Sequence, residues 1–422
     1  MSTSYTRNGK QRVVITGTGV VSALGLDVAT TWQALIAGKS GVVPITTFDA
    51  TDMPTRLAAT VKGFDATRYM NPREARRLSP FIHYALAAAQ EAVANSQLDL
   101  GREDPTRIGV EVGSGLGGTS VVEDQRVVLE TKGVRQLTPT LIPAILINTA
   151  ACVISIQMGL TGPVNSVAGG CATGAIAVSE AARRLAWGDA DVILAGGTES
   201  VMTPLSIAGF GRLGATTTRN ELLDKACAPF DAHRDGTVVG EGAAVLVLET
   251  LAHAMRRNAP ILAEVLGYCL TCDAHHLVAP DPTANGAARA IAGALHSAQV
   301  GRDELDWIVA HGTATKANDA IETLAIKTVL GEKAYQVPVS SNKAALGHTI
   351  GAAGAMSTVA AVQAMLTDCI PPTINYTTPD PDCDLDYVPN VARRAPVRTV
   401  LVNCFGFGGQ NSCLVLRKWD GR

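Results

Sequence analysis

The stretch Val164-Asn-Ser-Val-Ala-Gly-Gly-Cys-Ala-Thr-Gly-Ala-Ile-Ala-Val178 carries the clearest structural and chemical signal in the chain. Its first residues are compatible with a β-strand, and the two glycines that follow permit backbone angles that a side chain would forbid. Small, helix-forming residues come next and continue to Gly188, which predicts a helix that ends there. Cys171 is therefore predicted to lie at the N-terminus of a helix.

This position makes Cys171 a candidate nucleophile. The unpaired N–H groups at the start of a helix, together with the helix dipole, favour a thiolate. Small neighbouring residues would also let a substrate approach the sulfur. The alternative is a structural cysteine, because free cysteines are often small core residues.

The composition indicates a large globular enzyme with a substantial core, since 47% of the 422 residues are hydrophobic and 17% are charged. A net charge of −3 gives no reason to expect nucleic acid as a partner. Nine scattered cysteines, an odd count, argue against disulfides and zinc and favour a reducing, cytoplasmic location. The most apolar region, residues 141–160, is interrupted by proline and polar residues, so we expect no membrane association.

Predicted strands and helices alternate along the chain, which indicates an α/β fold with mostly parallel strand pairing. Residues 337–355 repeat the strand, loop and small-residue helix found around Cys171. We therefore expect two similar halves, residues 1–250 with the nucleophile and residues 251–422 with the histidines described below, and a site between them. Between the predicted strands, residues 229–236 form a turn-rich loop.

Two glycine-rich loops, in residues 12–21 and 108–118, raise the alternative of a nucleotide-binding protein. Neither has a phosphate-binding lysine motif, and the first lacks a full G-x-G-x-x-G and a supporting acidic residue. This alternative is therefore weak.

Two histidines stand at matching places in the second half. His311 and His348 each follow a predicted buried strand and lie among small residues. A single histidine is more often a core or surface group, but two at strand ends form a coherent set with a helix-terminal cysteine. A buried Lys343 would need a carboxylate partner, and Asp319 and Glu322 follow His311 closely. The glycine-rich loop at residues 403–411 offers backbone N–H groups of the kind an oxyanion hole requires.

These residues, in this order and with the Phe405-Gly-Phe-Gly-Gly409 loop, resemble the β-ketoacyl-[acyl-carrier-protein] synthases, the elongating condensing enzymes of type II fatty acid and polyketide synthesis. The resemblance runs from Arg12 to Leu416. It implies a thiolase-like α/β fold in five αβαβα layers, two pseudo-repeated halves, and a dimer. It also implies a Cys-His-His centre that uses no metal or other cofactor.

The resemblance implies a role for each catalytic residue. Cys171 takes the acyl chain from acyl carrier protein as a thioester, and the backbone N–H groups of Cys171 and Phe407 hold the oxyanion. His311 and His348 bind malonyl carrier and assist its decarboxylation, so that the resulting carbanion lengthens the chain by two carbons. Lys343, paired with Glu322 and near Asp319, supports this centre.

Other residues match the surroundings of the family's site. Phe407, with Phe405 and Gly408 beside it, matches the gate between the acyl and malonyl states, and Leu116 matches the lining of the acyl pocket. The arginines at the start of a predicted helix match the basic surface on which the acidic carrier docks. They are Arg73, Arg76 and Arg77.

Two features favour the ketosynthase subunit of type II polyketide systems, including those that make polyenes. They are Lys316, where the fatty acid enzymes usually have proline, and residues 383–389. The Asn403-Cys-Phe-Gly-Phe-Gly-Gly string resembles the fatty acid branch. The expected second subunit is therefore either a copy of this chain or a chain-length-factor-like paralogue.

Two other functions fit a related fold. A non-catalytic chain-length factor would lack the nucleophilic cysteine, which is present here. A thiolase would use a Cys-His pair in its second half, and Cys404 lies beside the glycine loop. His348 in its Gly-His-Thr-Ile-Gly context argues instead for decarboxylating condensation.

Overall fold

A ten-stranded mixed sheet forms the frame of the molecule in the computed structural model, which describes residues 4–421. Its first five strands in spatial order belong to the second half of the chain: β13 (Val339–Ser340), β12 (Trp307–Val309), β16 (Thr399–Gly406), β17 (Gln410–Lys418) and β11 (Ala263–Cys272). The other five belong to the first half: β3 (Val13–Val21), β10 (Gly242–Thr250), β8 (Val192–Glu199), β6 (Ile108–Gly113) and β7 (Val164–Asn165). The two sets meet where β11 pairs with β3 over three residue pairs.

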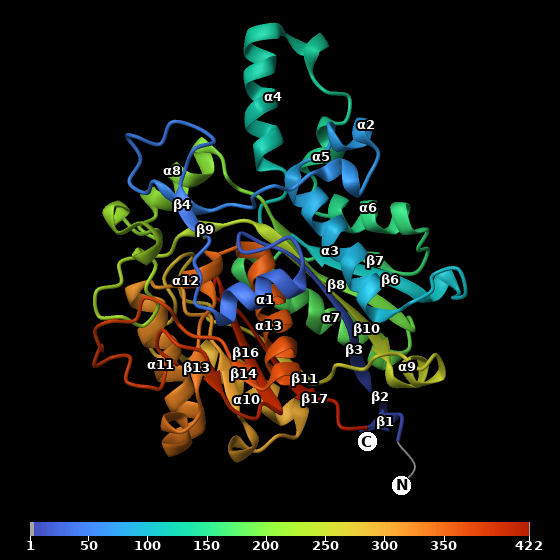
Figure 1. Ribbon diagram of the computed structural model, residues 1–422, viewed down its shortest axis with the longest axis vertical. Coiled ribbons are helices and arrows are strands. Elements are labelled where there is room, and N and C mark those ends of the chain that lie inside the picture. Colours follow the sequence, from blue (N-terminus) through green and yellow to red (C-terminus); the bar gives the residue numbers. More distant parts are fainter. Residues whose placement is uncertain (1–3, 422) are drawn as a thin grey trace.

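Helices cover both sets of strands and lie between them, which gives five αβαβα layers (Figure 1). The outer layer of the first half contains α3 (Pro80–Ser96) and α6 (Thr149–Met158), and that of the second half contains α10 (Asn285–Ala298) and α11 (Lys316–Leu330). The middle layer contains α7 (Thr173–Trp187) and α13 (Ala353–Thr367). Each helical layer has its own buried hydrophobic cluster against the strands. The α/β architecture in five layers that was predicted from the sequence is confirmed.

Smaller elements complete the chain. The helices among them are α1 (Val28–Ile36), α2 (Pro72–Ala75), α4 (Thr119–Lys132), α5 (Leu141–Ile145), α8 (Pro204–Arg212), α9 (Leu251–Arg256) and α12 (Lys343–Leu346). The strands are β1 (Thr6–Arg7), β2 (Lys10–Gln11), β4 (Val42–Pro44), β5 (Leu57–Ala59), β9 (Val239–Gly240), β14 (Cys369–Ile370) and β15 (Arg393–Arg394). Helix α4 projects from the body of the molecule (Figure 1) and has no buried residue.

The prediction of mostly parallel pairing is wrong. Of the nine pairings in the described ten-stranded sheet, four are parallel and five are antiparallel. The antiparallel strands lie together in the middle of the sheet, and the parallel strands lie toward both edges. All residues of β3, β8 and β10 are buried, so their apolar composition reflects helices on both faces and does not report strand direction.

Helices α7 and α13 cross at two glycines. A Cβ atom on Gly174 would lie 2.6 Å from the Ala355 nitrogen, and one on Gly354 would lie 2.5 Å from the Ala175 nitrogen. The two backbones therefore approach as closely as glycine allows.

One helical stretch, Ile350–Thr367, is long and apolar enough to cross a membrane, but 83% of it is buried between the two sets of strands, as expected of a core helix.

We expect Gly354→Ala to destabilise the protein, although alanine favours helix formation. The new methyl group would overlap backbone atoms of α7, and overpacking of this kind costs roughly 1–3 kcal/mol. Chemical denaturation would measure the change in the free energy of unfolding. The matched control is Gly209→Ala in α8, where a Cβ would meet no atom within 4 Å. That variant should be neutral or slightly stabilised, and equal losses in both variants would contradict the close crossing.

Candidate active site

Cys171 lies in a single 3₁₀ turn, Gly170–Ala172, that leads directly into α7. Gly170 has a φ of +54°, which favours glycine and turns the chain sharply before the cysteine. The thiol is free and its residue is only 6% exposed. The backbone N–H groups of Phe407 and of Cys171 itself lower the pKa of this thiol. The predicted placement of Cys171 at the N-terminus of a helix is therefore confirmed.

The predicted preference for a thiolate is wrong for the isolated site. Burial raises the pKa of the Cys171 thiol to about 11, and this effect outweighs the positive charge of Lys343 and the N–H group of Phe407, which both lower it. The helix terminus supplies N–H groups to the sulfur, but removal of the thiol from water dominates. Cys171 is thus a neutral thiol at ordinary pH.

The two histidines lie side by side, with ring centroids 5.5 Å apart and planes at 85°. Burial lowers the pKa of both imidazoles well below the usual value, and the charge of Lys343 lowers both further. Both rings are therefore neutral. The Nδ1 atom of His348 accepts a hydrogen bond from the Ile350 N–H at 3.3 Å, which leaves the Nε2 atom as a hydrogen-bond donor. The His311 ring also lies 5.7 Å from Phe405.

The residues predicted to support this centre are buried behind it, but Lys343 is not paired with Glu322 as predicted. Within residues 4–421, no carboxylate lies within 4.0 Å of the ammonium group of Lys343, which donates instead to the carbonyl oxygen of His311. Glu322 accepts hydrogen bonds from the backbone N–H groups of His311 and Gly312, each at 2.8 Å, and from Asn403 at 3.1 Å. Burial raises the pKa of Glu322 to about 7, and these donors oppose that rise.

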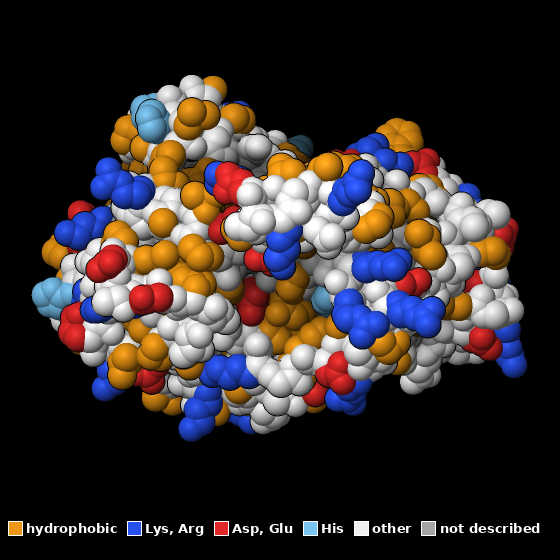
Figure 2. Space-filling model, turned by 90° about the horizontal axis from the view of Figure 1, so that it is seen from above, with side chains coloured by type: hydrophobic (Ala, Val, Ile, Leu, Met, Phe, Trp, Pro, Cys, Tyr) orange, Lys and Arg blue, Asp and Glu red, His pale blue; other side chains and the backbone are white. Residues whose placement is uncertain are grey.

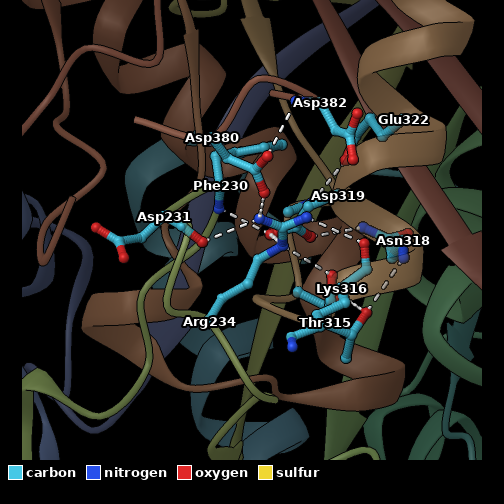
Figure 3. A network of polar contacts seen from close by, with 12 residues as sticks. Phe230, Asp231, Arg234, Thr315, Lys316, Asn318, Asp319, Glu322, Asp380 and Asp382 are labelled. Atoms are coloured by element: carbon cyan, nitrogen blue, oxygen red, sulfur yellow. Dashed lines mark hydrogen bonds and ion pairs between the residues drawn. The ribbon is translucent and has the colours of Figure 1, made fainter. Parts of the chain in front are cut away.

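Asp319 forms its ion pair with a residue that the sequence analysis did not single out. Arg234, which is 3% exposed, lies 3.6 Å from the Asp319 carboxylate and also contacts Asp380 (Figure 3). The Asp319 carboxylate also accepts the Phe230 N–H at 2.8 Å. The only sequence signal was an arginine within the turn-rich loop at residues 229–236, which by itself is typical of an exposed loop.

A cavity of about 560 Å³ contains the side chains that were predicted to be catalytic. Its lining includes Cys171, His311, His348, Phe405 and Phe407. Leu116, predicted to line the acyl pocket, is 42% exposed and does not line this cavity.

Glu199 is a second buried residue that the sequence analysis missed. Its carboxylate accepts the N–H groups of Gly115 at 2.8 Å, Leu116 at 3.3 Å and Gly351 at 3.1 Å. It thereby ties the Leu116 loop to the turn that follows His348. The sequence feature that could have indicated Glu199 is its place as a carboxylate at the end of an apolar predicted strand.

The loop between β16 and β17 closes one side of the cavity. Phe407 is 37% exposed, and the neighbouring Gly408 donates its N–H to the Leu277 carbonyl at 2.8 Å. Gly408 does not itself line the cavity.

The three arginines of the predicted carrier surface are exposed, but they share less helix than predicted. Helix α2 is a single turn, Arg76 is its C-terminal cap and Arg77 lies beyond it. Proline at position 80 starts a separate helix, α3. Lys and Arg side chains gather on the face seen in Figure 2, beside a hollow that is partly lined by hydrophobic side chains.

No group of three or more His, Cys, Asp or Glu side chains within residues 4–421 is arranged to hold a metal ion. Two cysteines, Cys269 and Cys272, have the spacing of a Cys-x-x-Cys metal-binding pair. They lie in strand β11, where residues three apart point to opposite faces of the sheet, so the two thiols do not form such a pair.

Comparisons with known proteins agree with this geometry. Residues 10–254 match the family description "Beta-ketoacyl synthase, N-terminal domain", and residues 262–377 match "Beta-ketoacyl synthase, C-terminal domain". The 3-oxoacyl-[acyl-carrier-protein] synthase 2 of Coxiella burnetii is 46% identical, over 97% of this chain and 99% of that protein. The protein of the same name from Synechocystis is 44% identical over the same shares.

Solved structures give the same result. A ketosynthase in complex with its type II polyketide synthase acyl-carrier protein superposes with a TM-score of 0.90 at 34% identity, over 97% of this chain and 100% of that chain. The ishigamide ketosynthase/chain length factor superposes with a TM-score of 0.90 at 36% identity and with the same coverage. The chain belongs to the β-ketoacyl synthase family.

Proposed function

We propose a ping-pong cycle in which this chain lengthens a carrier-bound acyl chain by two carbons. The chain is an acyltransferase, a β-ketoacyl-[acyl-carrier-protein] synthase, and it catalyses decarboxylative condensation. The observation that carries the assignment of roles is the shared cavity of Cys171, His311 and His348. It brings a nucleophile together with two neutral imidazoles.

In the first half of the cycle, the Cys171 sulfur attacks the carbonyl carbon of the acyl thioester. The N–H groups of Cys171 and Phe407, which both lower the pKa of the Cys171 thiol in the free enzyme, hold the oxyanion that develops. The carrier thiol leaves with the proton that the Cys171 thiol loses, and the acyl chain remains on Cys171. Because this thiol is neutral before reaction, proton removal accompanies the attack.

In the second half, His311 and His348 donate hydrogen bonds to the carbonyl oxygen of the malonyl thioester. Loss of carbon dioxide leaves an enolate, whose negative charge these donors stabilise. The enolate carbon attacks the acyl-Cys171 thioester, a carbon–carbon bond forms, and the Cys171 sulfur is released and reprotonated. Burial keeps both imidazoles neutral, the positive charge of Lys343 adds to this effect, and Lys343 is not a proton carrier.

We assign the surrounding residues by the same reasoning. Residues 1–250 form the half with the nucleophile, and residues 251–422 form the half with both histidines. Phe407, with Phe405 and Gly408, forms the gate, and the Leu116 loop borders the acyl chain once that chain is bound. The centre needs no cofactor, and the enzyme works in the cytoplasm.

The second subunit is either another copy of this chain or a chain-length-factor-like paralogue. The apolar side chains exposed on and near α4 and α5 support such a partner, since large exposed apolar patches mark interaction surfaces. They include Val122, Val127, Leu129, Ile142 and Leu146. The mass in solution of the chain alone, and with candidate paralogues, decides between the two. The fatty acid and polyketide pathways are distinguished by the acyl groups found on Cys171 after incubation with a panel of acyl carriers.

Cys171→Ala should abolish condensation and leave the fold intact, because alanine fits the buried position. Mass spectrometry of the wild-type protein after incubation with acyl carrier should place one acyl group on Cys171. Cys272→Ala, which removes an exposed thiol near the loop between β16 and β17, is the control and should keep the adduct. An acyl group on another cysteine would refute the assignment.

His311→Ala and His348→Ala should each slow malonyl decarboxylation by about 10²–10³-fold, the typical cost of losing a positioned oxyanion donor. Acylation of Cys171 should suffer less, because the backbone N–H groups serve that step. Carbon dioxide release and adduct formation measure the two steps separately. His253→Gln, at a buried histidine that pairs with Glu249 and Glu103 and does not line the cavity, is the control. Decarboxylation at the wild-type rate in both alanine variants would exclude these roles.

Reversal of charge at Arg76 and Arg77 to glutamate should raise the Michaelis constant for carrier-bound substrate. The carrier is acidic, so added salt should have a similar effect on the wild-type protein. Activity on a small carrier-free thioester should change little. Arg102→Glu, at another exposed arginine of the same half, should leave both activities unchanged. A parallel loss on both substrates would indicate damage to the fold.

A further inference from the structure

The turn-rich loop at residues 229–236 lies in the first half of the chain but packs against the second half. Its Phe230 N–H donates to Asp319 of α11 at 2.8 Å. The Phe230 ring also lies behind Gly312, where a Cβ atom would be 3.0 Å from the ring. Because Gly312 follows His311 directly, this loop supports the back of the turn that carries the histidine.

Arg234 connects this loop to the start of α11. Its guanidinium group donates to three backbone carbonyl oxygens and contacts two carboxylates (Figure 3). The carbonyl groups are those of Asp231 at 2.9 Å, Thr315 at 3.3 Å and Lys316 at 3.1 Å, and the carboxylates are those of Asp319 and Asp380. A buried arginine with all of these partners holds its side chain in one geometry.

Arg234 holds the first turn of α11 in place. The next turn of α11 carries Glu322, which contacts the backbone of His311. Glu322 lies three residues after Asp319, on the same face of the helix. Its carboxylate holds the N–H groups of His311 and Gly312 at 2.8 Å each. Any rotation or shift at the start of α11 therefore moves the carboxylate that fixes the His311 backbone.

We propose that Arg234 is a positioning residue for His311, and so for the decarboxylation step, an inference that rests on the proposed function. Arg234 does not line the cavity, so it acts through α11 and Glu322. Its loss would leave the Asp319 carboxylate buried without its ion-pair partner. Lysine would retain a positive charge but could not form the fork of contacts to the Thr315 and Lys316 carbonyls.

The test compares the two partial reactions in Arg234→Met and Arg234→Lys. We expect Arg234→Met to slow carbon dioxide release from malonyl carrier by about 10- to 100-fold, since a displacement of about 1 Å by a remote change costs up to 100-fold. Acylation of Cys171, followed by mass spectrometry, should change little, because its oxyanion donors are in the turn before α7 and in the β16–β17 loop. Arg234→Lys should fall between wild type and Arg234→Met. If Arg234→Met does not fold, Asp380→Asn, which weakens the ion pair at a less buried partner, should show the same selective loss to a smaller degree.

Arg257→Met is the matched control. Arg257 is another largely buried arginine that pairs with a carboxylate, Glu249, and donates to the carbonyl groups of Ser96 and Gln97, but it lies away from the cavity. Its loss should lower thermal stability without altering the ratio of the two partial reactions. An equal fall in both partial reactions of the Arg234 variants, or no fall, would overturn the proposal. Unimpaired decarboxylation in His311→Ala would instead refute the role of His311 itself.

Discussion

The crossing of α7 and α13 at Gly174 and Gly354 is the contact on which the active site depends. Cys171 lies three residues before Gly174, and His348 lies six residues before Gly354. Because each glycine lets the other helix approach to backbone contact, the turns that precede the two helices also meet. A side chain at either glycine would force the helices apart and would separate the nucleophile from the histidine. The chemistry of the site therefore rests on two residues that have no side chain.

This close packing also determines the charge states in the site. Cys171, His311 and His348 are each at most 6% exposed, and burial favours the neutral form of all three. Neutral imidazoles can donate to a developing enolate without first losing a proton. Because burial raises the pKa of the Cys171 thiol to about 11, the sulfur is held as a neutral thiol in the free protein.

The charged residues of the site lie behind Cys171 and the two histidines. Lys343, Asp319 and Glu322 are buried together with Arg234, and buried charges of this kind are costly unless they are paired and hydrogen-bonded. Some of the contacts that surround these buried charges come from the other half of the chain. Arg234 crosses from the first half, and Val239 forms a β-bridge with His348. The halves therefore depend on one another at the site, which is consistent with the continuous sheet between them.

The sequence by itself determined the α/β class, the strand–cysteine–helix unit around Cys171, and the identity of the two histidines, because these depend on local propensities and short motifs. It did not determine strand direction, since buried strands of either direction are apolar, nor the pKa of Cys171, which depends on burial by distant segments. The partner of Asp319 is Arg234, 85 residues away in the chain, and Lys343 contacts the His311 carbonyl, so neither pairing could be read from spacing. Only the tertiary structure brings these residues together, because burial and long-range pairing arise when the two halves pack around α7 and α13.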